Sequence, residues 1–454
     1  GVSGGGDVAV SVTALGNGVA NTVTSIVSDS TVKAGGDVTI TAQDVAPNIL
    51  PSWMLSADDQ KDMDAALAGS PIDLNANILA VMVSVAGSGK VAVGVGMMGN
   101  VVTNTVKADI IDSTVLAGLN ATTLAIENAA ADVYLTALSR TGIIAISVGV
   151  GASGQVAVSA TGFGNVITNS VDASITGAST TVKSGGLIDL TAKDQSHITS
   201  VGLSIAASGS TAISAIIGVN VVTNTVDSLI SGATVKSGTS LDVSAESTST
   251  IFGFAGGVAA SGSTAVQITM AGNVVTNKTR AVVTNSADVD AGGSVIISAK
   301  DTSIIDAIAF GVAASGSTAV GVGLSANVIV NTIQATISGG STLDTSSSLT
   351  LTADSSAIIR TLALGVAGSG STAVQVTAMG NVIVNSVTAT ISGTGTDVHA
   401  AGDIVIAATD IAPSVLTGWN TTSKAIVNTD AAAVNTTNET IIVSRNPWQT
   451  GDRV

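Results

Sequence analysis

Histidine is the first side chain to consider for acid–base chemistry, and the sequence contains only two. His197 and His399 each follow a strand-like segment. A Ser-His-Asp triad needs a nucleophile and a carboxylate placed around one histidine, and no spacing in the sequence supports such a set. Polysaccharide lyases use β-helix folds, but the Asp, Lys and Arg residues that they cluster are sparse here. We therefore expect no enzymatic activity.

Carboxylates could carry metal chemistry, because seven of them end the same kind of alternating segment. Stacked in successive coils, they would either repel one another or share a cation such as calcium. The alternative is that they are exposed turn residues, and we favour it. The seven positions are Asp44, Glu127, Asp194, Glu246, Asp301, Asp354 and Asp410, and all except Glu127 are kept as weak calcium candidates.

Pairs of asparagines, four residues apart, recur seven times and give the strongest signal in the sequence. The last four intervals between pairs are 55, 53, 54 and 54 residues. A glycine lies eleven residues before each first asparagine, as Gly209 does before Asn220. The pairs are Asn17 and Asn21, Asn100 and Asn104, Asn165 and Asn169, Asn220 and Asn224, Asn273 and Asn277, Asn327 and Asn331, and Asn381 and Asn385.

The segments around each pair alternate between apolar and polar residues, which indicates β-strands joined by Gly/Ser turns. In 100–110 one face carries both asparagines with Val102 and Val106, so both amides are expected to point inward. Before the pair the valines at 91, 93 and 95 are expected to be the inward set. The sequence thus predicts a corner or bulge near Gly99, where the inward face changes.

An inward asparagine without a partner would cost about 1–3 kcal/mol. Coils that stack in register remove this cost, because each amide can donate to its counterpart in the next coil. We therefore predict two axial asparagine ladders. The alternative is that the asparagines only ease turn formation.

Repeated units without helical patterns indicate an all-β parallel β-solenoid (β-helix) of about seven ~54-residue repeats. A unit of this length is compatible with two coils or with one wide coil, and the sequence does not choose between them. Antiparallel hairpins stacked into a prism are an alternative.

Composition supports a thin core and excludes several functions. Only 10% of residues are charged and 2% are aromatic, whereas glycine, alanine, valine, serine and threonine are abundant. The formal net charge of −16 argues against nucleic-acid binding, which needs basic stripes. The absence of cysteine excludes disulfides. The uncharged stretch 307–333 alternates with period two and is broken by glycine and polar residues, so we expect no membrane span.

Two segments depart from the repeat and divide the chain. We predict a partial first repeat at 1–44, an irregular insertion at 45–77, further repeats at 78–410 and an irregular tail at 411–454. The insertion holds a possible helix that Ser56 could cap. The three tryptophans lie in the irregular segments and are the assembly or binding candidates: Trp53, Trp419 and Trp448.

The tail carries an apolar run, ETIIVSRNPW at 439–448. One hypothesis is that this run adds a strand to the next molecule and so assembles copies end to end. Low charge also favours lateral association of the shafts. The alternative is that the ends reflect only where the sequence was cut.

The phrases GNVVTNTVKADIIDSTVLAG and AAGDIVIAATD resemble the large bacterial filamentous adhesins, the haemagglutinin-like and leukotoxin-type repeat exoproteins. The resemblance covers 1–44 and 78–410. It implies export to the bacterial surface or biofilm matrix, a solenoid shaft and a role in adhesion. We expect an extracellular structural shaft, as a stalk or a fibre-forming subunit. The alternative is an adhesin segment that binds glycans or proteins of a host or neighbouring cell.

Overall fold

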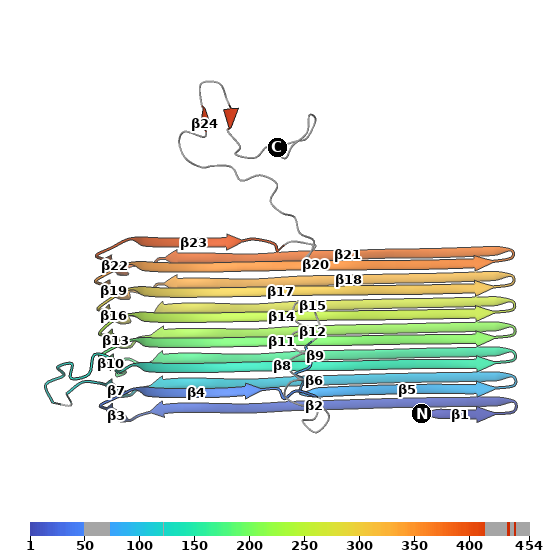
Figure 1. The fold of residues 1–454 in the computed structure, drawn as a ribbon, viewed down its shortest axis with the longest axis horizontal. Helices are drawn as coiled ribbons and strands as arrows, with labels where there is room; N and C mark the ends of the chain where they lie inside the picture. The colour runs from blue at the N-terminus through green and yellow to red at the C-terminus, as the bar shows by residue number, and fades with distance from the viewer. Residues whose placement is uncertain (50–72, 121, 414–433, 436–439, 442–454) are drawn as a thin grey trace. The chain divides into compact units, whose positions relative to one another are not determined.

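The computed structural model describes residues 1–49, 73–120, 122–413, 434–435 and 440–441. It divides into two units, Gly1–Ala412 and Pro413–Val454. The first unit consists of three parallel sheets whose strands stack coil upon coil, as Figure 1 shows from blue to red. The predicted all-β parallel β-solenoid is confirmed.

Two of the sheets contain long strands and face each other. Sheet A contains β1 (Val2–Gly5), β4 (Val38–Val45), β5 (Ile78–Ser88), β8 (Val133–Ser153), β11 (Ile188–Ser208), β14 (Leu241–Ser261), β17 (Val295–Ser315), β20 (Leu349–Ser369) and β23 (Ile404–Asp410). Sheet B contains β2 (Val8–Ser28), β6 (Val91–Ile111), β9 (Val156–Thr176), β12 (Thr211–Ser231), β15 (Thr264–Thr284), β18 (Thr318–Ile337) and β21 (Thr372–Ile391).

A short third sheet closes one edge of the slab. Sheet C contains the four-residue strands β3 (Thr31–Ala34), β7 (Thr114–Ala117), β10 (Thr181–Ser184), β13 (Thr234–Ser237), β16 (Asp288–Ala291), β19 (Thr342–Thr345) and β22 (Asp397–Ala400). We call this edge the wide end. At the opposite edge tight turns join strands of sheet A to strands of sheet B, as Gly209 and its neighbours join β11 to β12, and we call that edge the tip (Figure 1).

Each repeat forms one wide coil, which settles the choice that the sequence left open. Asn220 pairs in register with Asn273, 53 residues later, and Asn273 pairs with Asn327, 54 residues later. One coil therefore runs through sheet A, the tip turn, sheet B and sheet C before it returns. All pairing between coils is parallel within this unit, so the alternative of antiparallel hairpins is wrong.

Stacking of the tip turns explains the glycine that precedes each asparagine pair. A Cβ atom on Gly209 would lie 2.2 Å from the carbonyl oxygen of Gly154 in the preceding coil. The same contact would occur at 2.1 Å between Gly262 and Gly209. Any side chain here would force adjacent coils apart, so the turn requires glycine for close approach rather than for an unusual φ.

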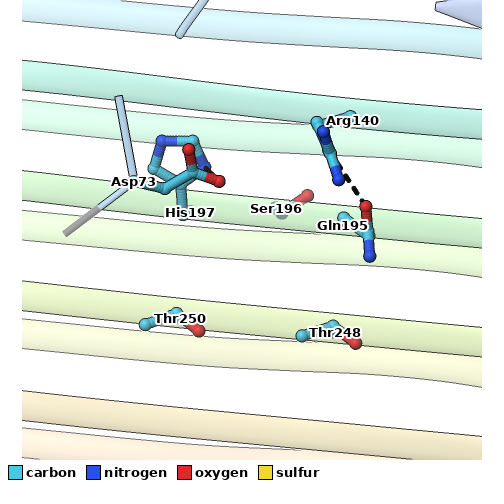
Figure 2. A pocket seen from close by; sticks show the side chains of 7 residues that line it. All are labelled: Asp73, Arg140, Gln195, Ser196, His197, Thr248 and Thr250. Carbon is cyan, nitrogen blue, oxygen red and sulfur yellow. Dashed lines mark hydrogen bonds and ion pairs between the residues drawn. The ribbon is translucent and has the colours of Figure 1, made fainter. Parts of the chain in front are cut away.

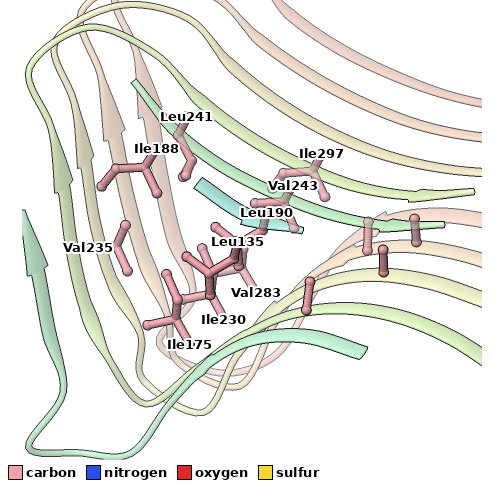
Figure 3. Close-up of a cluster of buried hydrophobic side chains, with 14 of the residues drawn as sticks. Leu135, Ile175, Ile188, Leu190, Ile230, Val235, Leu241, Val243, Val283 and Ile297 are labelled. Atoms are coloured by element: carbon pink, nitrogen blue, oxygen red, sulfur yellow. The ribbon is translucent and has the colours of Figure 1, made fainter. Parts of the chain in front are cut away.

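The wide end has an aliphatic core that all three sheets enclose. Figure 3 shows its leucine, isoleucine and valine side chains converging beneath sheet C. Among them Leu190 from β11, Ile230 from β12 and Val235 from β13 are at most 1% exposed. Burial of such side chains contributes about 1.5–3 kcal/mol each. This core fixes the curvature that brings the chain from one long sheet to the other.

The core at the tip consists of alanine, because the two long sheets approach each other closely. Its central cluster is Ala157, Ala206, Ala212, Ala259, Ala265, Ala313 and Ala319. In β6, a Cβ atom on Gly94 would lie 3.2 Å from the carbonyl oxygen of Val150, and one on Gly96 would lie 2.8 Å from Met82 Cε. The Gly94 position therefore has no room for a valine side chain, whereas the next inward column widens and holds Thr161, Ile216 and Thr269 in later coils.

The predicted change of face near Gly99 is wrong. The strand β6 alternates without interruption, with Ala92, Gly94, Gly96 and Met98 inward. The valines at 91, 93 and 95 point outward instead. Hydrophobicity suggested the valines as the core, but close to the tip turn the narrow gap between the sheets accepts Ala92, Gly94 and Gly96 instead, and it admits a long side chain only further along the strand, at Met98.

The insertion interrupts one strand of sheet A. Both β4 and β5 pair with β8, at Val133–Arg140 and Ile143–Ser153 respectively, so together they occupy the place of one long strand. The possible helix at Ser56 and the candidates Trp53, Trp419 and Trp448 lie outside the described residues. In the second unit, β24 (Val434–Asn435) and β25 (Thr440–Ile441) form an antiparallel pair. No helix among the described residues is long and apolar enough to cross a membrane.

Candidate functional site

The first asparagine of each pair forms the predicted axial ladder. In every coil its Nδ2 atom donates to the Oδ1 atom of the counterpart in the next coil. From Asn17→Asn100 to Asn327→Asn381 the six distances are 2.7, 2.7, 2.8, 2.8, 2.7 and 2.9 Å. Asn100, Asn165 and Asn327 are fully buried. The ladder satisfies amides that would otherwise be costly to bury.

Small residues of sheet A make room for this ladder. The residues that face it include Ser200, Gly253 and Ala307, which are in register with one another. A Cβ atom on Gly253 would lie 3.1 Å from Asn273 Oδ1, and Asn220 Nδ2 also donates to Ser200 Oγ at 2.8 Å. The position of the ladder therefore depends on the sequence of both long sheets.

The second asparagine of each pair forms a different network from the predicted one. Its side-chain amide donates across the interior to sheet A rather than to its counterpart in the next coil. The axial links that exist here run from a backbone N–H to a side-chain oxygen, at 3.2 Å for both Asn169→Asn224 and Asn277→Asn331. The second column therefore joins the two sheets as well as adjacent coils.

Two fully buried aspartates accept these cross-sheet hydrogen bonds. Asp194 Oδ1 accepts from Asn169 Nδ2 at 2.8 Å, and its Oδ2 accepts from Asn224 Nδ2 at 2.7 Å. Ser196 Oγ also donates to Asp194 Oδ2 at 2.7 Å. Each carboxylate is thus held by amides from two successive coils and by the serine two positions further along its own strand. We call this arrangement a carboxylate cage.

The cage around Asp301 repeats the same arrangement two coils later. Asn331 Nδ2 donates to its Oδ1 at 2.6 Å, and Asn277 Nδ2 donates to its Oδ2 at 2.9 Å. Ser303 Oγ donates to Oδ1 at 2.7 Å. The serines of the two cages were missed in the sequence, although the recurrence of Asp-x-Ser at 194–196 and 301–303 could have indicated them.

Serine occupies the same position in the coils between the cages. Register places aspartate and serine alternately in one inward column of sheet A. Adjacent carboxylates in this column are therefore two coils, or about 9.6 Å, apart instead of about 4.8 Å. The spacing limits the repulsion between buried like charges. The column is Asp44, Ser139, Asp194, Ser247, Asp301, Ser355 and Asp410.

The predicted column of seven carboxylates is therefore wrong. Glu246 and Asp354 lie one register position away, on the outer face, where Lys193 Nζ contacts Glu246 Oε2 at 2.7 Å and Thr409 donates to Asp354. Glu127 lies in the loop between β7 and β8. A shift of one residue reverses the direction of a strand side chain, and this is the difference that the sequence pattern concealed.

The calcium hypothesis gains no support from this geometry. Within the described residues no group of three or more His, Asp or Glu side chains could hold a metal ion. The cage carboxylates accept hydrogen bonds from amide and hydroxyl donors, and an amide N–H cannot bind a cation. The caged Asp194 and Asp301, and the terminal Asp44 and Asp410, which accept from Asn21 at 3.1 Å and Asn385 at 3.2 Å, are therefore structural partners of the asparagines.

Burial controls the protonation of the cages. It raises the pKa of Asp194 to about 7, against the opposing effect of hydrogen bonds from Ser196 and Asn169. Burial likewise raises the pKa of Asp301 to about 6, against hydrogen bonds from Ser303 and Asn277. Both carboxyl groups consequently bind protons more tightly in the folded chain than in the unfolded chain.

A polar pocket lies on the outer face of sheet A, where the end of the insertion returns to the sheet (Figure 2). Its volume is about 230 Å³. The His197 side chain is 8% exposed, and its Nδ1 atom lies 3.8 Å from Asp73 Oδ2. Arg140 Nε donates to Gln195 Oε1 at 3.0 Å. The lining residues are Asp73, Arg140, Gln195, Ser196, His197, Thr248 and Thr250.

This pocket lacks a Ser-His-Asp triad, although all three residue types line it. Ser196 directs its hydroxyl into the interior toward Asp194, whereas the adjacent His197 lies on the outer face. Desolvation lowers the pKa of His197, although the nearby Asp73 carboxylate acts in the opposite direction. The lowered pKa favours the neutral imidazole. The second histidine, His399, is 74% exposed and lies 3.9 Å from Asp344. The pocket can bind polar groups through hydrogen bonds, but it does not contain an activated nucleophile.

No protein-family model, curated protein or solved structure matches this chain.

Proposed function

We propose that the chain is a structural shaft: an extracellular β-solenoid of a bacterial surface or matrix, present as a stalk or as a fibre-forming subunit. The observation that carries this proposal is the unbroken asparagine ladder from Asn17 to Asn381. Side-chain and backbone hydrogen bonds run together along the axis, so each coil is a template for the next. A rod built in this way resists bending and proteolysis.

Two further features support a mechanical role. The tip glycines hold adjacent coils in backbone contact, and the carboxylate cages tie the two long sheets together. The resemblance to filamentous adhesins favours export and a bacterial cell surface. We propose no catalytic activity, because Ser196 and His197 point to opposite faces of the sheet.

Electron microscopy of negatively stained, purified chain tests this proposal. We expect straight rods with resistance to limited proteolysis throughout Gly1–Ala412. Uniform long fibres would favour a polymerising subunit, and isolated short rods would favour a stalk. Flexible or collapsed particles that are cleaved within the coils would contradict the shaft.

A second candidate function is adhesion, in which the chain binds glycans or proteins of a host or neighbouring cell. The polar pocket at His197 favours this function, because Arg140 and two threonines surround a hollow with room for a polar group. A glycan array probed with the chain and with Arg140→Gln tests it. Loss of a signal in Arg140→Gln, but not in the outer-face control Lys193→Gln, would support adhesion at this pocket. Identical signals from all three proteins would contradict it.

A further inference from the structure

The outer face of sheet B is divided into an apolar half and a polar half. From the tip turn to the second asparagine the strands contain no charged residue. The first charged residue of each central strand comes only toward the wide end: Lys107 in β6, Asp172 in β9, Asp227 in β12 and Lys278 in β15. The outward side chains nearer the tip are mostly valine, isoleucine, leucine and methionine. We call the outward residues from the tip turn to the Val101 column the tip face.

Several side chains of the tip face are strongly exposed. Among the described residues, Met97 is 64% exposed, Ile217 51% and Val219 41%. A contiguous exposed apolar surface of this kind typically marks an interaction site. Ten residues along each strand and six steps between coils give the tip face about 900 Å². A standard stable interface buries about 800 Å² on each partner, so the tip face is large enough for one.

A furrow of small residues runs along the tip face parallel to the solenoid axis. It is formed by the outward residue that directly precedes each ladder asparagine. Val219, between Gly164 and Gly272, is its bulky member. In register order the furrow is Gly16, Gly99, Gly164, Val219, Gly272, Ala326 and Gly380.

A ridge lies beside the furrow, two residues closer to the tip. Its large members are Met97, Ile217, Met270 and Leu324. Apolar hollows lie along this border, one of about 340 Å³ beside Gly164 and one of about 320 Å³ beside Gly272. Gly99, where the sequence predicted a corner, therefore lies in the furrow on the outer face of sheet B.

We propose that the tip face of sheet B binds a second copy of this chain, with the ridge of each copy in the furrow of the other. Ridge and furrow are adjacent columns, so the surface is complementary to itself when one copy is rotated against the other. The columns repeat every ~4.8 Å, and a second solenoid has the same spacing. A globular partner would not present side chains in rows of this period.

This pairing is lateral and is independent of the shaft function, since a single solenoid could serve as a stalk. Sedimentation velocity of the full chain over a wide concentration range tests the pairing. We expect a reversible monomer–dimer equilibrium. Ile217→Glu should raise the dissociation constant about a hundredfold, because it would bury an unpaired charge in the contact. The matched control Thr225→Glu, an outward residue on the polar half of the same strand, should leave it unchanged.

Filling the furrow with larger side chains tests whether the dimer depends on the shape of the tip face or only on its hydrophobicity. Gly164 has no atom within 4 Å of an added Cβ, and Gly272 has only Val219 Cγ2 at 4.0 Å, so leucine fits the fold at both positions. Gly164→Leu/Gly272→Leu should weaken the dimer at least about tenfold although it makes the surface more apolar. Circular dichroism would verify that both variants keep the β structure.

Three results would overturn the proposal. The first is a wild-type chain that stays monomeric at every concentration. The second is association that persists unchanged in Ile217→Glu and in the double leucine variant, which would place the contact elsewhere. The third is a monomeric chain that binds phosphatidylcholine vesicles through Ile217, which would make a lipid surface the occupant instead of a second copy.

Discussion

The wide end and the tip of the solenoid are built on opposite patterns. At the wide end large aliphatic side chains such as Leu190 and Ile230 lie inside, and charged residues such as Asp227 lie outside. At the tip alanine lies inside, as at Ala212, and large aliphatic side chains such as Ile217 lie outside. Both regions belong to the same uninterrupted strands.

The space between two sheets, rather than hydrophobicity alone, therefore decides which side chains form a core. Three sheets at the wide end enclose a volume that leucine, isoleucine and valine fill together with alanine. Next to the tip turn, at the alanine column, two closely spaced sheets leave room for little more than a methyl group. The asparagine ladder and the carboxylate cages lie between these regions, where the gap is wide enough for an amide.

The largest expected effect comes from placing a carboxylate in every coil. Ser247→Asp would put three buried carboxylates at about 4.8 Å spacing, with Asp194 and Asp301 as its neighbours. We expect the free energy of unfolding to fall by about 5 kcal/mol near pH 8, and chemical denaturation measures it. The loss should diminish as the pH falls and the carboxyl groups become protonated. A loss that is independent of pH would contradict the alternating column.

The cages also predict a pH dependence of the unmodified chain. The pKa of Asp194 is raised from 3.8 to about 7 by burial, so the folded chain binds its proton more tightly than the unfolded chain. Stability is therefore greatest below the unfolded pKa and falls as the pH rises toward 7, by on the order of 4 kcal/mol. Denaturant titrations from acidic to neutral pH measure this slope. Asp194→Ser should reduce it, and an unchanged slope would assign the effect to other groups.

Truncation of two isoleucines of one strand tests the comparison directly. Ile230→Ala, in the wide-end core of β12, should cost about 3 kcal/mol because it leaves a cavity. Ile217→Ala, on the tip face of the same strand, should change the free energy of unfolding by no more than about 0.5 kcal/mol. Thermal and denaturant unfolding at low protein concentration measure both. Equal costs would mean that the tip buries its large side chains as the wide end does.

Enlarging a buried residue at the tip tests how closely the two long sheets approach each other there. Ala212→Leu should destabilise the chain by about 2–3 kcal/mol, because the facing sheets leave no room for the added atoms. The control Ala215→Leu changes an outward residue of the same strand and should be nearly neutral. A neutral Ala212→Leu would show that the sheets can separate at the tip.

Removal of one rung of the ladder should have the smallest effect among these changes to buried residues. In Asn273→Leu the amide of Asn220 loses its axial acceptor and keeps only Ser200 Oγ, and the Oδ1 atom of Asn327 loses its axial donor. We expect a cost of about 2 kcal/mol, measured by denaturation. Asn273→Gln, which keeps the amide but displaces it, is the matched comparison. A stabilised Asn273→Leu would mean that the ladder is not needed for coil stacking.

Much of this fold could be predicted from the pattern of repeats. The spacing of the asparagine pairs predicted a stacked parallel solenoid, and alternation correctly placed Asn100 and Asn104 inward. The first ladder followed, because an inward amide repeated in every coil finds its partner in the next coil. These predictions depend only on period and alternation, which are local properties of the chain.

The features that failed prediction depend on contacts between distant strands. Val91 was expected inside because it is large and apolar, but the nearness of the facing sheet excludes it. Glu246 was expected in one column with Asp194, but it lies one register position away and points outward. The pocket at His197 requires the end of the insertion, including Asp73, to lie against β11.

The repeat period, the inward asparagines and the recurring glycine before each pair can be recognised in the amino-acid sequence alone. The number of coils in each repeat, the alternation of aspartate with serine and the outward position of the large aliphatic residues at the tip depend on contacts in the folded chain. The physical reason is that a strand sequence records which residues share a face. The gap between facing sheets and the register between coils then decide which face is buried and which side chains meet.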